Sequence, residues 1–163
     1  MQDGQIQIYC GEGHGKSAAA LGQAVALAGE GKHAVIIQFL KNLEDSEFIR
    51  RLEPEIKVFR FEKSDRNFEG LSGQEQQEEV QNIHNGLNFA KKVLTTGECD
   101  LLVLDEVLGL IDNHIIEAQE LRAILEIKSE GQSIILTGIR MNDETCVVAD
   151  EVYTIDPMQY KVF

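Results

Sequence analysis

The sequence has few positive charges, and this deficit limits the partners that the protein can bind. It contains 15 Lys and Arg residues against 28 Asp and Glu residues, which gives a formal net charge of −13. Because such a charge repels polyanions, nucleic acid is excluded as a general partner. An anionic small molecule must instead be held by a local group of cations and backbone N–H donors.

Cysteine pairs and long apolar runs are also missing. The 3 cysteines, Cys10, Cys99 and Cys146, are widely spaced and form no C-x-x-C motif, which excludes a disulfide framework and fits a reducing compartment. The N-terminus has no basic segment followed by an apolar core, so we expect no secretory signal. The apolar runs are too short to cross a bilayer. These absences predict a cytoplasmic protein with no membrane partner.

What the sequence does contain is a regular alternation of short apolar runs and helical patterns over its 163 residues. Strands are expected at 5–10, 33–39, 57–61, 99–106, 133–137 and 152–155. Helices are expected at 16–29, 74–94, near 121–125 and at 142–149, and a loop is expected at 62–73. No shift in composition divides the chain, so we predict a single nucleotide-binding domain over 1–163.

A glycine-rich stretch, CGEGHGKS, joins the first expected strand to the first expected helix. In a phosphate-binding loop, glycines let the backbone approach the anion, a lysine reaches the phosphate oxygens, and a Ser or Thr hydroxyl faces Mg²⁺. The stretch has this order, with Cys10 in place of the first glycine of the strict pattern. A turn that binds nothing is the alternative. We expect nucleotide binding by the following loop residues: Gly11, Glu12, Gly13, His14, Gly15, Lys16, Ser17 and Ala18.

A second motif, LLVLDE, ends a nearly continuous apolar strand of the kind that is buried on both faces of a parallel sheet. Its carboxylates, Asp105 and Glu106, fall at the C-terminal end of that strand, where open α/β sheets bind ligands. In P-loop proteins the aspartate of this strand helps to hold Mg²⁺. The two motifs and the strand–helix alternation predict an α/β, three-layer, P-loop NTPase-like fold with a mainly parallel sheet of about six strands.

Two basic residues follow the C-terminal ends of expected strands. Lys41 comes after IIQFL and Arg140 comes after IILTG, so either could supply positive charge to a triphosphate. A solvated surface cation is an equally good interpretation of each. The histidines show no metal-ligand spacing, although His14 lies inside the loop, and no Ser/His/Asp or Cys/His arrangement can be argued. Cys10 is interpreted as a small buried residue at a strand end.

These motifs together resemble those of the P-loop corrinoid adenosyltransferases. The loop of that family typically reads T-G-N-G-K-G-K-T-T and also lacks the strict first glycine, so Cys10 falls where the family has threonine. QFLK is similar to its Q-F-I-K, LLVLDEV to its V-V-L-D-E-L, IILTG to its I-I-T-G-R, and VADEVYTI to its L-A-D-x-V-x-E. The similarity runs from about residue 5 to residue 155.

The resemblance implies a particular reaction, in which Co(I) of a corrinoid attacks the 5′ carbon of ATP and triphosphate is released. It implies catalytic roles for Lys16, Ser17 and Glu106, and Mg²⁺ held by Ser17, Asp105 and Glu106. It also implies a role for Lys41, which matches the family lysine, a reductase that supplies Co(I), and a homodimer. Positioning and charge neutralisation would carry this reaction, which needs no protein nucleophile or base.

Several positions depart from the family pattern. His14 stands where the family has lysine and Glu12 where it has asparagine, so the loop loses one positive charge and gains a negative one. Arg140 is displaced by one residue from the family arginine. The aromatic side chains that would meet the corrin are reduced to three: Phe59, Phe61 and Phe68.

Two other functions therefore stay open. One is an ordinary P-loop ATPase or NTPase in which Glu106 activates water against the γ-phosphate. The other is a nucleotide- or corrinoid-binding module whose catalysis has decayed.

Overall fold

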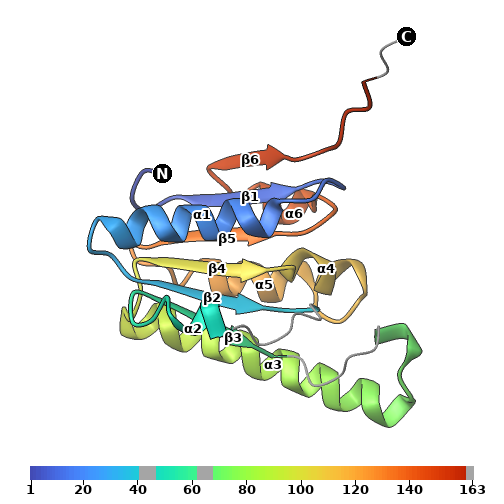
Figure 1. Cartoon of the computed structure of the whole chain (residues 1–163). Helices are drawn as coiled ribbons and strands as arrows, with labels where there is room; N and C mark the ends of the chain where they lie inside the picture. The colour runs from blue at the N-terminus through green and yellow to red at the C-terminus, as the bar shows by residue number, and fades with distance from the viewer. Residues whose placement is uncertain (41–46, 62–67, 161–163) are drawn as a thin grey trace.

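The computed structural model describes residues 1–40, 47–61 and 68–160, and it has the predicted α/β architecture (Figure 1). Six strands form one all-parallel sheet in the order β3-β2-β4-β5-β1-β6. The strands have these bounds: β1 Ile6–Cys10, β2 Ala34–Gln38, β3 Ile56–Arg60, β4 Leu101–Asp105, β5 Ser133–Thr137 and β6 Glu151–Thr154. Since every pair is parallel, all the carboxyl ends lie at one edge of the sheet.

Helices cover both faces of this sheet and complete the three layers (Figure 1). Their bounds are α1 Lys16–Gly29, α2 Glu47–Arg50, α3 Gly73–Thr96, α4 Val107–Asp112, α5 Ala118–Leu125 and α6 Asp143–Cys146, with a 3-10 turn at Phe68–Gly70. Among the helices of the described residues, none combines the length and the hydrophobicity that a membrane span requires.

The alternating side chains of β4 divide the core into two clusters. Leu102 and Leu104 belong to the larger cluster, which also holds the apolar faces of α3, α4 and α5. Leu101 and Val103 belong to the second cluster, which packs against α1. All five residues of β4 are buried, as expected of a strand that is covered on both faces.

The strand order places β5 between β4 and β1. Tyr9 of β1 pairs with Thr137 of β5, and Leu104 of β4 pairs with Leu136 of β5. The loop after β1 and the acidic end of β4 are therefore separated by one strand, and the last residue of that strand lies between them. This edge is the point where ligands bind in open α/β sheets.

Several predicted bounds differ from those of the structure. The expected loop at 62–73 contains a 3-10 turn in its described part, and α3 starts at its last residue and continues to Thr96. The helix α4 was not predicted, because Val107–Asp112 continues the apolar run of β4. The last predicted helix is shorter than expected, ending at Cys146.

Candidate active site

The glycine-rich loop runs from the end of β1 to the start of α1 and encloses its lysine. Gly15 has φ 103 and is the N-cap of α1, a left-handed conformation that glycine adopts without strain. Lys16 is only 8% exposed, and its Nζ donates to the carbonyl oxygens of Gly11 at 2.7 Å and Gly13 at 2.8 Å. The loop backbone thus holds one positive charge at its centre.

The first half of the loop is hydrogen-bonded to neighbouring strand ends. The Gly11 N–H donates to the Ile139 carbonyl at 2.9 Å, and the Gly13 N–H donates to the Ile155 carbonyl at 2.8 Å. By contrast, the N–H groups of Gly15 and Lys16 donate to no other residue in the part of the chain that the structure describes. Together with the positive end of the α1 dipole, they can bind an anion.

Asp105 lies beside this loop at the end of β4. Its side chain is 1% exposed, and its Oδ1 accepts hydrogen bonds from the Ser17 hydroxyl at 2.8 Å and from the Thr137 hydroxyl at 2.6 Å. The carboxylate therefore joins the first turn of α1 to β4 and β5. This contact brings together two residues that are 88 positions apart in the sequence.

Glu106 follows directly and has an unusual backbone. Its φ is 63 and it is the N-cap of α4, a left-handed conformation that is uncommon outside glycine and is enriched at functional sites. Its N–H donates to the Thr137 hydroxyl oxygen at 2.8 Å. The half-buried Glu106 side chain lies near the first turn of α4, where a Cβ on Gly109 would be 4.0 Å from its Oε2.

The oxygen ligands at this edge suit Mg²⁺. Among the described residues, no three or more His, Cys, Asp and Glu side chains form a metal cage. Mg²⁺ bound with a nucleotide does not need such a cage, since one or two carboxylates, water and phosphate oxygens complete its octahedron. The Ser17 hydroxyl and the Asp105 carboxylate, 2.8 Å apart, have the right chemistry for two of its ligands.

The other predicted site residues are more scattered. Glu12, His14 and Ala18 are exposed along the loop and the first turn of α1. Arg140 is exposed and lines a hollow of about 480 Å³ together with Glu12. Lys41 lies outside the described residues.

Two of the three expected aromatic residues pack against α3. The Phe59 and Phe61 rings lie 4.7 Å and 5.8 Å from the Phe89 ring, measured between centroids, and both side chains are partly buried against the larger core cluster. The Phe68 side chain lies outside what the structure describes. Cys10 is 3% exposed, as predicted for a small buried residue.

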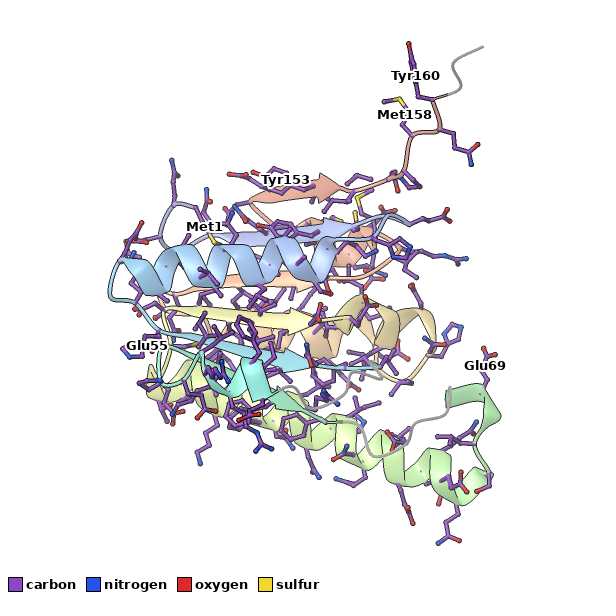
Figure 2. The ribbon with its side chains drawn as sticks, in the orientation of Figure 1. Met1, Glu55, Glu69, Tyr153, Met158 and Tyr160 are labelled. Carbon is purple, nitrogen blue, oxygen red and sulfur yellow. The ribbon has the colours of Figure 1, made fainter. Side chains whose placement is uncertain are left out.

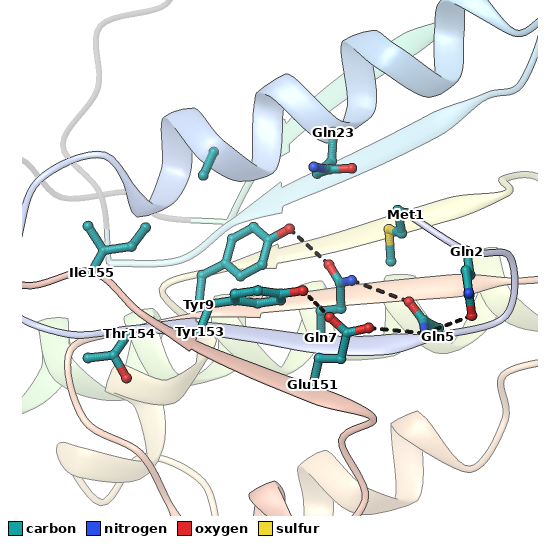
Figure 3. A pocket seen from close by; sticks show the side chains of 11 residues that line it. Met1, Gln2, Gln5, Gln7, Tyr9, Gln23, Glu151, Tyr153, Thr154 and Ile155 are labelled. Atoms are coloured by element: carbon teal, nitrogen blue, oxygen red, sulfur yellow. Dashed lines mark hydrogen bonds between the residues drawn. The ribbon is translucent and has the colours of Figure 1, made fainter.

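A larger hollow, of about 550 Å³, lies on the sheet face beside α1 (Figure 3). Its wall carries a chain of hydrogen bonds in which the Tyr9 hydroxyl donates to Gln7 at 2.9 Å and the Gln7 amide donates to Gln5 at 3.3 Å. Burial raises the pKa of Tyr9 above its usual value. A hydrogen bond to Glu151 raises the pKa of Tyr153, which lies on β6 (Figure 2). Neither Lys16, Ser17 nor Asp105 lines this hollow.

Two residues that the sequence interpretation missed contact the site. Thr137 bridges Asp105 and Glu106; the polar residue at the end of the apolar run SIILT is the signal that could have found it. Asp156 accepts the Glu12 N–H at 2.9 Å. Nothing in the local sequence links these two acidic residues, because the contact depends on β6 lying next to β1.

Comparison with known proteins adds evidence independent of this geometry. A family model described as ATP:corrinoid adenosyltransferase BtuR/CobO/CobP matches residues 2–162. The corrinoid adenosyltransferase of Escherichia coli K12 is 24% identical over 157 residues, which cover 96% of this chain and 79% of the relative. CobA, the corrinoid adenosyltransferase of Salmonella typhimurium, is 25% identical with the same coverage. That of Pseudomonas aeruginosa is 24% identical over 144 residues, 83% of this chain and 66% of the relative.

Proposed function

Because the chain belongs to the family of ATP:corrinoid adenosyltransferases, we propose that it transfers the 5′-deoxyadenosyl group of ATP to the Co(I) of a corrinoid. The hydrogen bond of 2.8 Å between Ser17 and Asp105 is the main structural support, because it joins the phosphate-binding loop to the acidic strand end. Nucleotide and Mg²⁺ bind at such a junction in P-loop proteins.

The proposed reaction is a displacement at carbon. The electron pair of Co(I) forms a bond to the 5′ carbon of ATP while the bond between that carbon and the triphosphate oxygen breaks. Triphosphate leaves with the bonding pair, and cobalt is formally oxidised by two electrons. Since the attacking atom belongs to the corrinoid, the protein has to orient the two substrates and stabilise the leaving charge.

Lys16 is the residue best placed to stabilise the triphosphate. Its Nζ donates to two loop carbonyls at 2.7 and 2.8 Å, so it is already held inside the loop. We infer that it moves its hydrogen bonds to phosphate oxygens when ATP binds, while the Gly15 and Lys16 N–H groups donate to the same anion. In a protein of net charge −13, this local cluster of donors has to offset the general repulsion.

The side-chain oxygen atoms beside the loop suggest which residues would hold Mg²⁺. Ser17 and Asp105 would hold Mg²⁺, with Glu106 beside them, and the bound ion would neutralise part of the triphosphate charge. Thr137 keeps the Asp105 carboxylate oriented through its hydrogen bond of 2.6 Å. Lys41 and Arg140 stay predictions as further cations for the nucleotide.

The decisive test is anaerobic incubation with ATP, Mg²⁺ and chemically reduced cob(I)alamin. Visible absorbance would follow formation of the Co–C bond, and triphosphate would be measured as the second product. We expect both products from the natural sequence and neither from Lys16→Ala. Thermal unfolding of the two proteins would show whether the variant keeps its fold.

A parallel phosphate-release assay without corrinoid separates the alternatives. Phosphate released in the absence of corrinoid, with no Co–C bond formed in its presence, would replace the transferase proposal by the NTPase. Nucleotide binding with neither product would favour a binding module. The reductase, the homodimer and the cytoplasmic location are further proposals that rest on the family resemblance.

A further inference from the structure

The segment that follows β6 crosses the first half of the phosphate-binding loop. The Ile155 N–H donates to the Cys10 carbonyl at 2.7 Å, and the Ile155 carbonyl accepts from the Gly13 N–H at 2.8 Å. Between these bonds, Oδ1 of Asp156 accepts the Glu12 N–H at 2.9 Å. Three hydrogen bonds thus connect two residues of this segment to the loop, and only the middle one uses a side chain.

Close approach of the same segment explains two of the loop glycines. A Cβ on Gly11 would lie 2.4 Å from the Ile155 carbonyl oxygen and 2.7 Å from Oδ1 of Asp156. A Cβ on Gly13 would lie 2.6 Å from that carbonyl oxygen. These distances are well below van der Waals contact, so both positions require glycine whether or not a phosphate is bound. Gly15, whose Cβ would have nothing within 4 Å, is free of this constraint.

We propose that Asp156 is a positioning residue of the phosphate-binding loop, which fixes the Glu12 peptide and so preorganises the donors that follow it. The proposal rests on nucleotide binding by the loop, as argued above. The loop is thereby divided into two parts. Cys10, Glu12 and Gly13 are hydrogen-bonded to the segment after β6, and the N–H groups after His14 are left for the phosphates.

Because the side chain that accepts the Glu12 N–H is the carboxylate of Asp156, its negative charge also affects the affinity for ATP. Asp156, Glu12 and Arg140 line the same hollow of about 480 Å³ beside the loop. A second negative charge near the triphosphate opposes binding through Coulomb repulsion, while the hydrogen bond favours binding through preorganisation. The two effects have opposite signs, so they can be separated by substitution.

Two variants make this separation. Asp156→Asn keeps an oxygen that can accept the Glu12 N–H and removes the charge, whereas Asp156→Ala removes both. Asp156 is exposed, so neither change opens a cavity. Glu126→Ala is the matched control, because Glu126 is an exposed carboxylate at the C-cap of α5, which leads to the opposite edge of the sheet.

Two measurements on the full chain test the proposal. The first is hydrogen exchange of the Glu12 amide by NMR without nucleotide, which we expect to be about tenfold faster in Asp156→Ala because a charge-assisted hydrogen bond is lost. The second is ATP titration with Mg²⁺. We expect about tenfold weaker binding for Asp156→Ala, and binding at least as tight as that of the natural sequence for Asp156→Asn and for the control.

The outcomes are distinct. Unchanged Glu12 exchange in Asp156→Ala, or equal ATP affinity of the Ala and Asn variants, would overturn the positioning role. If the natural sequence and Lys16→Ala both fail to bind ATP, the proposed function fails. The exchange rates then still decide whether Asp156 fixes the Glu12 peptide.

Discussion

The Thr137 hydroxyl donates a hydrogen bond of 2.6 Å to Oδ1 of Asp105, across the boundary between β5 and β4. The same hydroxyl oxygen accepts the N–H of Glu106 at 2.8 Å. The fully buried Thr137 side chain therefore orients the Asp105 carboxylate, which also accepts a hydrogen bond from Ser17. It also provides an acceptor for the N–H of Glu106, the left-handed residue that follows Asp105. Its position at the end of the strand between β4 and β1 makes this double contact possible.

Removing this hydroxyl should destabilise the protein. Thr137→Val keeps the shape of the side chain but removes the hydroxyl that accepts the Glu106 N–H and donates to Asp105, at a cost of about 1–3 kcal/mol in the free energy of unfolding. Thr137→Ser keeps the hydroxyl and should lose less than half as much. Urea denaturation would measure both. Equal loss in the two variants would show that the methyl group, rather than the hydroxyl, carries the effect.

The negative charge in the loop should limit nucleotide affinity. Glu12 is an exposed residue within the glycine-rich loop, so Glu12→Gln should tighten ATP binding by about two- to fivefold through reduced repulsion. His14→Lys should act in the same direction by adding a positive charge. Isothermal titration at low ionic strength would measure both changes.

Salt dependence provides the control for this charge effect. The gain in ATP affinity of Glu12→Gln and His14→Lys should shrink at about 1 M salt, where the Debye length is about 3 Å. Glu126→Gln, the distant control, should leave the affinity unchanged at both ionic strengths. An affinity gain that persists in high salt would point to a change in loop conformation instead.

Two glycine substitutions should have opposite effects on stability. Gly11→Ala places a Cβ 2.4 Å from the Ile155 carbonyl oxygen at a residue with φ +117, so the loop must distort and the melting temperature should fall. Gly22 is an exposed position inside α1 whose Cβ would meet nothing within 4 Å. Gly22→Ala should therefore raise the free energy of unfolding by about 0.5–1 kcal/mol. Calorimetry of both variants would check these signs, and stabilisation by Gly11→Ala would contradict the clash.

The strands were predictable because buried parallel strands are short, continuous apolar runs. All five residues of β4 are buried, and the run LLVLD stands out from the sequence alone. The end of this run was harder to define, because Val107–Asp112 is just as apolar but is helical. The chain turns from β4 into α4 at Glu106, which has a φ of 63. A glutamate in the sequence does not indicate such a left-handed conformation. Local propensity cannot show such a break.

The arrangement of the candidate site was predictable only in part. Lys16, Ser17 and Asp105 belong to local motifs with a known geometry, and the structure brings them together. The roles of Thr137 and Asp156 depend on strand order, since β5 lies between β4 and β1, and β6 lies next to β1. The Glu12–Asp156 contact joins residues that are 144 positions apart. Spacing in the sequence carries no information about such contacts.

Cys99 should make the stability fall in alkaline solution. Burial, with a smaller contribution from Asp100 and then Glu98, raises the pKa of its thiol from 9.0 to about 12. Between these values the unfolded thiol ionises while the folded thiol stays protonated, so the unfolded state binds fewer protons. The stability that the protonated Cys99 thiol contributes is therefore complete below pH 9 and is lost as the pH rises toward 12. The free energy of unfolding falls over this range with a slope of at most about 1.4 kcal/mol per pH unit.

Comparison with Cys99→Ala isolates this titration from that of other groups. The variant should be less stable near pH 8 because Cys99 is 4% exposed and well packed, and the cavity penalty does not depend on pH. Its free energy of unfolding should then fall less steeply than that of the natural sequence between pH 9 and pH 10.5. Urea denaturation at several pH values measures the two slopes. Parallel slopes would mean that the thiol ionises equally in both states, and that burial of Cys99 in the connection before β4 does not exclude water.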